Sequence, residues 1–554
     1  MSQDFVQHSN EINNSHKAKV DNDSSLENKK EILKTQNSSF CQNVNLKDIN
    51  PDFNRQDNNE MPPLNEKYIE LPKQTDKEII PEEEIPQTEN ANTEIEVKTT
   101  EEVKEFKVRT CNLIFMMINL AIGYFMFGYE VGVFNQIQLN IAHDLQWAKD
   151  DKKIYISVIS VMIAVGAIFG SVVMGKVSYQ TGRKWAYIIN DIIMLVGIAI
   201  TMIANTVSMI IGRFMCGFAV GGYTAIVPVF LKELVPANFK GYGSSIYNLE
   251  YNIGMLIAFS LGINIPSPDK DDFVWWRVVY AIPSVLVILN MIILLVVYKD
   301  DSPMHLYVLE DIEGAITAYK QVYEDEDEIR EVIMMLEKDI KKKEAEQVDY
   351  KELCSGRFAQ QIFIGIFLNI GLQCCCMNIF NYYSTSIFLK SISLNLATLF
   401  TSMLGVARLT GAVVSFFIFG KLAKKKVLLT GYSCICGCLF TTSLLDHFQT
   451  YEPIRYILLF HYFVFGSTIF TVYEIGPELL PDIGVGVVTL FHWVMNVFVT
   501  VSFPFLNASP MELKWTLMMY VGFLLVIILI FALLYKESTG IPLSKVEEIY
   551  RTWI

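Results

Sequence analysis

The stretch “GRFMCGFAVGGYTAIVPVFLKELVPANFKG”, residues 212–241, combines a long apolar run with regularly spaced small residues. The run extends back to about residue 207, so as a helix it can cross the roughly 30 Å hydrocarbon layer of a membrane. A helix is the expected form, because in lipid every backbone polar group must find its partner inside the protein. Gly217, Gly221 and Gly222 are small enough to let a neighbouring helix approach closely.

Apolar runs of this length recur along most of the chain. The 554 residues are 52% hydrophobic and their mean hydropathy is positive, which is not the composition of a soluble domain. The sequence therefore predicts an all-α membrane protein with twelve transmembrane helices. They are expected near residues 112–134, 154–174, 185–204, 207–231, 242–264, 276–298, 359–388, 395–420, 426–445, 454–477, 483–506 and 514–535.

Two long segments lie outside these runs. Residues 1–106 are rich in Asn, Glu, Lys, Asp, Gln and Ser, and such a composition buries too little apolar area to offset the entropy of ordering. Residues 299–355 contain “DEIREVIMMLEKDIKKKEAEQ”, whose apolar residues recur at helical spacing. The predicted organisation is a disordered N-terminal tail (1–106), a six-helix half (107–298), a helical insert (299–355), a second six-helix half (356–536) and a C-terminal tail (537–554).

Lysines and arginines in the short loops indicate how the chain lies in the membrane, because cytoplasmic loops are enriched in both. Lys176, Arg183 and Lys184 follow the second predicted span, and “KLAKKK” follows the eighth. We therefore expect the insert and both tails in the cytoplasm. The protein is expected to be an integral, multi-pass protein of the plasma membrane, with an internal membrane as the alternative.

Short motifs repeat at one offset in the two predicted halves. “GKVS” begins at Gly175 and “GKLA” at Gly420, while “ELVP” begins at Glu233 and “ELLP” at Glu478, so both pairs are 245 residues apart. Each pair follows equivalent spans of the two halves. Six-helix halves repeated in parallel are the plan of the major facilitator transporters, in which the solute binds between the halves near the midplane of the membrane.

Further motifs, in their order along the chain, resemble the sugar porter family of the major facilitator superfamily. The opening stretch resembles the family's Gly-Arg, spaced glycines and Pro-x-Tyr-x-x-Glu-x-x-Pro, with Phe230 in place of the tyrosine and Lys240 in place of an arginine. “NYYSTSIF” from Asn381 resembles the end of the family's seventh helix, and “WWRVV”, “DDSP” and “KESTG” resemble its sixth-helix, central and C-terminal signatures. The resemblance covers residues 111–549 and implies a carrier whose two halves rock about a central site.

The resemblance also implies a set of residues that bind the solute. A sugar carries many hydroxyl groups, so its site needs amides that donate and accept hydrogen bonds, and an aromatic face against the ring. Arg408 and His492 each stand where the family usually has asparagine. The implied solute-binding residues are Asn248, Gln373, Asn378, Arg408, Tyr473, His492, Trp493 and Asn496.

Arg408 is the unusual member of this set. An arginine near the middle of a membrane helix costs roughly 2.5–3.5 kcal/mol on insertion scales, so it should face the cavity and have a partner. Glu474, next to Tyr473, is the expected partner, and Glu250 is the less favoured one. If Glu474 faces elsewhere, Arg408 is a cation available to an anionic solute.

Charged residues on other spans indicate how the conformational change is controlled. The resemblance implies that Glu130 pairs with Arg213, and that protonating Glu130 frees Arg213 and couples proton uptake to opening. A static ion pair is the alternative. The resemblance also implies a cytoplasmic network of Arg183, Glu233 and Glu478 that holds one conformation until the solute shifts the balance.

Three functions fit these features. The first is a carrier of a sugar or similar polyol, by facilitated diffusion or proton symport. The second is a carrier of an anionic solute such as an organic acid or phosphate, with Arg408 as ligand, and the third is a non-transporting nutrient sensor that signals through the N-terminal tail.

No nucleophile–base pair, metal-ligand cluster or phosphate-binding loop stands out in the sequence, so we expect no enzyme activity, cofactor or metal site. The net charge of −14 argues against nucleic acid as a partner. The expected partners are the solute, the lipid bilayer and, in a symporter, protons.

Overall fold

The computed structural model describes residues 106–554, apart from 237–238, 264, 271–273, 346–352, 354–356, 419–422, 449–451, 470–478, 508–511, 538–545, 547 and 551–554. The predicted disordered tail, residues 1–106, lies outside the described residues except for its last residue.

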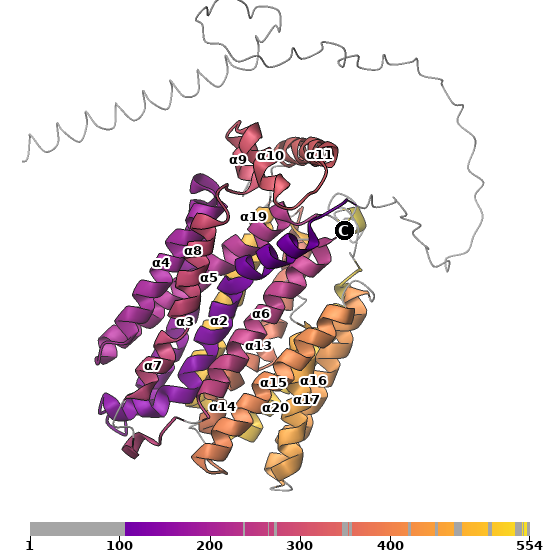
Figure 1. Ribbon diagram of the computed structural model, residues 1–554. Helices are drawn as coiled ribbons and strands as arrows, with labels where there is room; N and C mark the ends of the chain where they lie inside the picture. The colour runs from indigo at the N-terminus through magenta and orange to yellow at the C-terminus, as the bar shows by residue number, and fades with distance from the viewer. Residues whose placement is uncertain are drawn as a thin grey trace, which may run out of the picture. The chain divides into compact units, whose positions relative to one another are not determined.

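The first predicted half is a bundle of long helices, each built on one of the apolar runs (Figure 1). α2 packs along α6, and α5 packs between α3 and α4. The helices are α2 (Thr110–Asp144), α3 (Lys152–Thr181), α4 (Arg183–Thr201), α5 (Thr206–Leu234), α6 (Lys240–Leu261), α7 (Trp275–Ala281) and α8 (Ser284–Val296).

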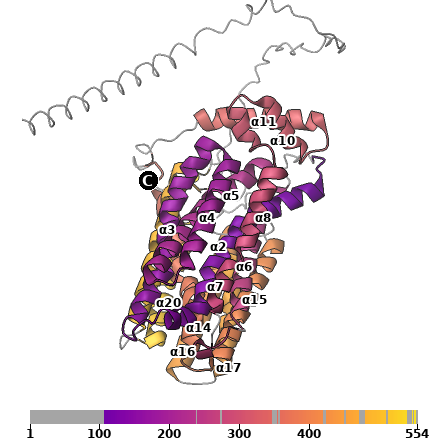
Figure 2. The same cartoon turned by 60° about the vertical axis from the view of Figure 1, so that its left-hand side comes forward.

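The second half repeats this arrangement. α15 packs against α17, and α16 packs against both α17 and α20. The halves meet along three helix pairs: α3 with α19, α2 with α14, and α6 with α15, the last visible in Figures 1 and 2. The helices are α13 (Ala359–Cys374), α14 (Met377–Phe388), α15 (Leu394–Ile418), α16 (Lys424–His447), α17 (Glu452–Ile469), α19 (Asp482–Leu506) and α20 (Glu512–Leu534).

Ten helical stretches among the described residues are long and apolar enough to cross a membrane, which confirms the predicted multi-pass helical fold. The two other predicted spans are also helical. α6 carries Asn248, Glu250 and Asn252 among its apolar residues, which makes it less hydrophobic, and α17 is followed by residues 470–478, outside the described part of the chain.

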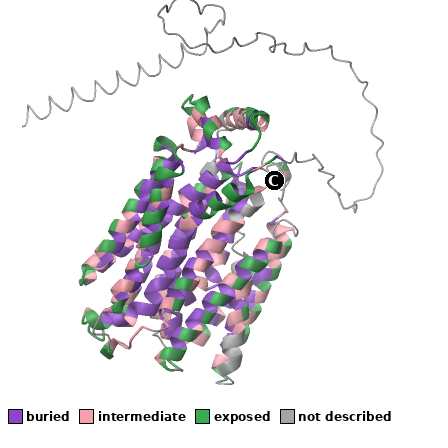
Figure 3. Cartoon of the chain, viewed as in Figure 1, coloured by how far each residue is buried: buried purple, intermediate pink, exposed green. Residues whose placement is uncertain are grey.

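The burial pattern is that of a bundle surrounded by lipid. Buried residues gather along the middle of the bundle, and exposed residues lie on its outer helices (Figure 3). Val172, Phe417 and Leu533 are each 65% exposed. Large apolar side chains with this exposure are unfavourable in water, whereas in a bilayer they face the apolar hydrocarbon chains of the lipids.

Two of the predicted spans are each made of two helices. Ile282 and Pro283 separate α7 from α8, and the proline has no N–H to continue the helical hydrogen bonds. Cys375 and Cys376 separate α13 from α14, because Cys376 is in the left-handed region with φ +59°. The break leaves the Cys375 carbonyl outside the helical ladder, where it accepts a hydrogen bond from the Tyr462 hydroxyl.

The predicted insert contains three helices gathered at one end of the bundle (Figure 1). Polar side chains cap two of them: Ser302 Oγ accepts a hydrogen bond of 3.2 Å from the His305 N–H, and Asp311 Oδ1 accepts one of 2.9 Å from the Gly314 N–H. The helices are α9 (Pro303–Val308), α10 (Ile312–Lys320) and α11 (Glu326–Ala345).

The chain enters α2 through a short extended segment that is fastened to the insert. Two backbone hydrogen bonds, of 2.8 and 3.1 Å, join residues 107–109 to residues 322–324 around an antiparallel bridge. The ring of Phe106 packs edge-on against that of Tyr323, with centroids 5.8 Å apart. We call residues 106–109 and 322–324 the clasp. It holds the start of α2 against the turn between α10 and α11.

α3 and α5 touch through glycines on both helices. A Cβ at Gly166 or Gly170 of α3 would overlap backbone atoms of α5, and a Cβ at Gly217 or Gly221 of α5 would overlap backbone atoms of α3. A Cβ at Gly222 would overlap a side chain of α4. These glycines therefore permit the close approach expected of small residues in membrane helices.

Replacing Gly170 with alanine should lower the melting temperature of the purified protein in detergent. The added Cβ would overlap the Phe218 carbonyl oxygen, and overpacking of this kind costs about 1–3 kcal/mol. Gly175→Ala, on the same helix, is the matched control, because its Cβ would lie 3.8 Å from the nearest atom, in Ala225. Equal losses in the two variants would show that close packing is not the cause.

Candidate functional site

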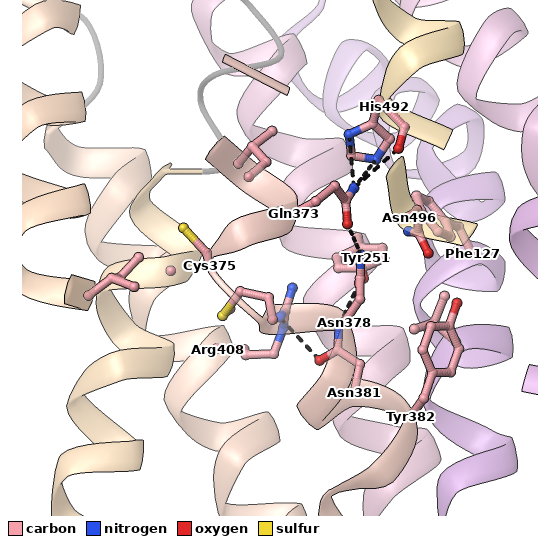
Figure 4. A pocket seen from close by; sticks show the side chains of 15 residues that line it. Phe127, Tyr251, Gln373, Cys375, Asn378, Asn381, Tyr382, Arg408, His492 and Asn496 are labelled. Carbon is pink, nitrogen blue, oxygen red and sulfur yellow. Dashed lines mark hydrogen bonds between the residues drawn. The ribbon is translucent and has the colours of Figure 1, made fainter. Parts of the chain in front are cut away.

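A cavity lies between the two halves, beside the break that separates α13 from α14 (Figure 4). The first half contributes Phe127 and Val131 from α2 and Tyr251 from α6. Its place between the halves is where the parallel repeat predicts a solute site. The second half contributes Leu372, Gln373, Cys375, Met377, Asn378, Asn381, Tyr382, Arg408, Ile435, Gly466, His492 and Asn496.

Arg408, on α15, lines this cavity and is only 2% exposed. Its Nε donates to Asn252 Oδ1 at 3.1 Å, and its Nη1 donates to Asn381 Oδ1 at 3.3 Å. Its guanidinium carbon lies 5.4 Å from the centre of the Tyr251 ring and 5.9 Å from that of Phe463, within the range of cation–π attraction. Among the described residues, amide oxygens and aromatic faces therefore answer this charge, and no carboxylate pairs with it.

Of the two partners predicted for Arg408, only Glu250 lies among the described residues. Glu474 and Tyr473 belong to residues 470–478, outside the described residues. Glu250 is described and lies on α6, but it forms no ion pair with Arg408. The contact from α6 comes instead from Asn252, two residues further along.

A chain of side-chain hydrogen bonds leads from Arg408 to α19 (Figure 4). Asn381 Nδ2 donates to Asn378 Oδ1 at 3.2 Å. Asn378 Nδ2 donates to Gln373 Oε1 at 2.8 Å. Gln373 Nε2 lies 3.2 Å from each ring nitrogen of His492. Four helices of the second half thus share one polar array.

The same array reaches into the first half and includes most of the predicted residues. Asn252 Nδ2 donates to Asn248 Oδ1 at 3.0 Å, one turn away on α6. We call the whole set the amide array. Five of its seven members were expected from the sequence, and its members are Asn248, Asn252, Gln373, Asn378, Asn381, Arg408 and His492.

Two more predicted residues lie beside the array. Asn496 lines the cavity and its Oδ1 accepts a hydrogen bond of 3.2 Å from the Thr500 hydroxyl. Trp493 packs against Phe127 across the halves, with ring centroids 5.8 Å apart. Its buried indole Nε1 makes no hydrogen bond with the described residues.

Several residues of the site were missed in the sequence. Asn252 lies four residues after Asn248, and Asn381 three residues after Asn378, so helical spacing alone places each beside a predicted residue. The rings of Phe127 and Tyr251, 4.7 Å apart, carried no comparable signal, because aromatic residues are frequent throughout this chain.

Glu130 of α2 and Arg213 of α5 form an ion pair inside the first half. Arg213 Nη1 lies 3.0 Å from Glu130 Oε2 and also donates to the Glu130 carbonyl oxygen at 2.8 Å. Both side chains are 0% exposed, and the guanidinium carbon lies 5.3 Å from the centre of the Phe134 ring. Glu130 Oε1 and Arg213 Nε and Nη2 make no hydrogen bond with the described residues. One side-chain hydrogen bond, buried from solvent, therefore joins the two charged groups.

Two of the three residues predicted for the cytoplasmic network meet at one end of the bundle. Arg183, at the start of α4, holds Glu233, near the end of α5, with Nη2–Oε1 at 2.8 Å and Nε 3.2 Å from each carboxylate oxygen. The Arg183 N–H donates to Asp301 Oδ1 at 2.8 Å, which attaches the insert to the same corner. The third residue, Glu478, lies outside the described residues.

The sequence matches the family described as “Sugar (and other) transporter” over residues 116–550. It is 25% identical, over 442 residues, to the probable metabolite transport protein CsbC of Bacillus subtilis strain 168, covering 77% of this chain and 92% of that protein. It is 26% identical, over 457 residues, to the major myo-inositol transporter IolT of the same organism, covering 78% of this chain and 93% of that protein.

The structure is similar to those of the xylose transporter XylE from E. coli. A partially occluded inward-open form has a TM-score of 0.66 at 17% identity and covers 78% of this chain and 99% of that chain. A second structure, described as the proton:xylose symporter bound to 6-bromo-6-deoxy-D-glucose, has a TM-score of 0.68 at 16% identity and covers 80% and 99%. The likeness establishes the fold of the major facilitator superfamily.

Glu130→Leu should destabilise the protein strongly, because it leaves the buried Arg213 charge without a counter-ion. Removing one partner of a buried pair costs about 3–5 kcal/mol, whereas replacing both partners with apolar residues of similar volume is often neutral. Adding Arg213→Met to the first change should therefore restore much of the lost stability. Thermal unfolding in detergent measures both. A double variant no more stable than Glu130→Leu would contradict the pair as an electrostatic unit.

Proposed function

The chain belongs to the family of sugar (and other) transporters, and we propose that it moves a neutral sugar or similar polyol across the membrane by alternating access. The observation that carries the proposal is the amide-lined cavity between the halves. Gln373, Asn378 and Asn381 supply amide groups that can form hydrogen bonds with a polyhydroxylated solute. The rings of Phe127 and Tyr251 supply apolar faces for its C–H surface.

The relatives support this solute class. IolT is named for myo-inositol and XylE for xylose, and both solutes are neutral and densely hydroxylated. Trp493 adds a buried indole donor next to the cavity, which would suit a further hydroxyl group.

We assign the gate on the side away from the insert to contacts between α2 and α14. Asn135 Nδ2 donates to Ser384 Oγ at 2.7 Å and to the Asn381 carbonyl oxygen at 2.9 Å, and Asn135 Oδ1 accepts from the Thr385 N–H at 3.2 Å. Asn135 lies further from the insert than the residues of α2 that line the cavity. With the insert in the cytoplasm, as the loop charges predict, these bonds close the outer side and break when the cavity opens outward.

We also propose that transport is coupled to protons through Glu130. Its carboxylate is the only described ionic partner of Arg213, and the two residues lie on different helices, α2 and α5, of the first half. A proton on Glu130 would cancel that attraction and leave Arg213 free to shift, so the protonated and ionised states would favour different conformations.

Uptake of labelled glucose, xylose and myo-inositol into proteoliposomes tests both proposals. We expect saturable uptake of at least one of them, with accumulation driven by an inward proton gradient. Glu130→Gln loses the charge but keeps an oxygen that can accept from Arg213 Nη1, which Glu130→Leu does not, so it should keep downhill flux and lose the gradient-driven accumulation. Glu250→Gln removes another carboxyl from a membrane helix and, as the control, should keep it.

Other results of this experiment would separate the alternatives. Uptake that is equal with and without the gradient would mean facilitated diffusion, with the Glu130–Arg213 pair static. Binding of a sugar without flux would instead indicate a sensor.

A second candidate function is favoured by one observation: Arg408 lines the cavity and donates its described hydrogen bonds to neutral amide oxygens. A cation in a membrane cavity suits an organic acid or phosphate. Saturable uptake of such an anion, abolished by Arg408→Gln and accompanied by no uptake of any sugar, would establish this function in place of the first.

A further inference from the structure

The hydrogen bonds of the amide array all run in one direction, away from Arg408. Arg408 donates to the side-chain oxygen of Asn381, and the nitrogen of Asn381 donates to the oxygen of Asn378. The nitrogen of Asn378 donates to the oxygen of Gln373, whose own nitrogen faces the ring of His492. Each amide on this arm points its oxygen toward the cation and its nitrogen away from it (Figure 4).

The second arm, into the first half, has the same sense. Arg408 Nε donates to the oxygen of Asn252, and the nitrogen of Asn252 donates to the oxygen and the carbonyl of Asn248. Both arms therefore begin at the one member of the array that carries a full charge.

This common direction follows from what a guanidinium can do. Arginine has five N–H donors and no acceptor, so any amide that touches it must present oxygen. The NH₂ group of that amide then points away from the cation and donates to the next neighbour, which accepts in turn. In the low dielectric of a membrane protein the charge also aligns the amide dipoles, and successive hydrogen bonds strengthen one another.

We propose that Arg408 is a positioning residue that turns the wall of the cavity into a hydrogen-bond donor toward the solute. The proposal rests on the sugar or polyol transport proposed above and adds which part of each hydroxyl group is recognised. The oxygens of Asn378 and Asn381 already accept from the array, whereas each of their nitrogens keeps a second proton that the array does not use. Arg408 Nη2 makes no hydrogen bond with the described residues, so it adds further donors.

A cavity wall that only donates hydrogen bonds interacts with the oxygen lone pairs of a hydroxyl group and makes no use of the hydroxyl proton. A neutral amide at position 408 would remove this bias, because it can present either oxygen or nitrogen to its neighbours. The amides could then take either orientation, and the wall could both donate and accept.

Deoxy and deoxyfluoro analogues of the transported sugar separate these cases, because fluorine can accept a hydrogen bond but cannot donate one. We measure inhibition of labelled sugar uptake by each analogue in proteoliposomes. At the hydroxyl groups that face the array, the wild type should bind the fluoro analogue within a few-fold of the parent sugar and the deoxy analogue about tenfold more weakly, the effect of about 1.4 kcal/mol. Arg408→Gln should bring the two analogues to similar inhibition at those positions.

Two variants serve as matched controls. Arg408→Lys keeps a donor-only cation and should keep the preference for fluoro over deoxy, even if it weakens affinity. Thr410→Val, on the same helix, changes an exposed residue that bonds only to the Val406 carbonyl, and it should leave the whole inhibition profile unchanged.

If Arg408→Gln does not fold, Asn381→Leu replaces it, because it cuts Arg408 from Asn378 and Gln373 and should abolish the preference in the same way. A wild-type profile in which deoxy and fluoro analogues inhibit equally at every hydroxyl group overturns the inference, while sugar transport stands. A preference that persists in Arg408→Gln or in Asn381→Leu also overturns it. Failure of the wild type to transport any sugar overturns the proposed function and the inference together.

Discussion

A positive charge buried in a membrane bundle must be stabilised by groups inside the protein, and two arginines of this chain are stabilised in opposite ways. Arg213 is met by one carboxylate, that of Glu130, in a closed pair with few other contacts. Arg408 is met by amide oxygens of α6 and α14 and by two aromatic faces. The first solution concentrates the compensating charge, whereas the second spreads it through the walls of the cavity.

The hydrogen bonds of Arg408 also connect the cavity to the seam between the halves, where α6 packs against α15. Arg408 and Asn252 face each other across α15 and α6, and nearby Ser402 Oγ donates to the Phe259 carbonyl oxygen at 2.8 Å across the same seam. Gly405 permits the close approach here, since a Cβ on it would lie 3.1 Å from the Leu256 Cα. The atoms that contact a solute and those that hold the halves together are therefore neighbours in one hydrogen-bonded set. A change in the solute contacts therefore directly alters the contacts between the halves, and the reverse also holds.

Sequence reasoning reached the parts of this molecule that depend on length and periodicity. The spans followed from apolar runs, and the repeated “ELVP” and “ELLP” motifs placed the cavity between two halves. It did not reach the break at Cys376, because a left-handed cysteine has no sequence signature; Asn381, which meets Arg408, lies on the helix that begins after this break. Asn252 was missed for a related reason: helical spacing gives the neighbours of a residue on its own helix, but only tertiary packing decides which of them faces another helix.

The partner foreseen for Arg408 illustrates the same limit. Glu474 was chosen for its nearness in sequence to an implied site residue, and it lies outside the described residues together with Tyr473 and Glu478. Those three assignments stay predictions. The ion pair of Glu130 with Arg213, by contrast, is present. The resemblance could indicate it because α2 and α5 are continuous helices, so no break shifts the alignment of either residue.

The clasp has a mechanical consequence for everything that precedes it in the chain. Phe106 and the backbone of residues 107–109 are anchored on the insert, and the insert is itself anchored on α4 through Asp301 and Arg183. A force applied to the residues that precede Phe106 would therefore reach the insert and α4 through these contacts, as well as the first turn of α2.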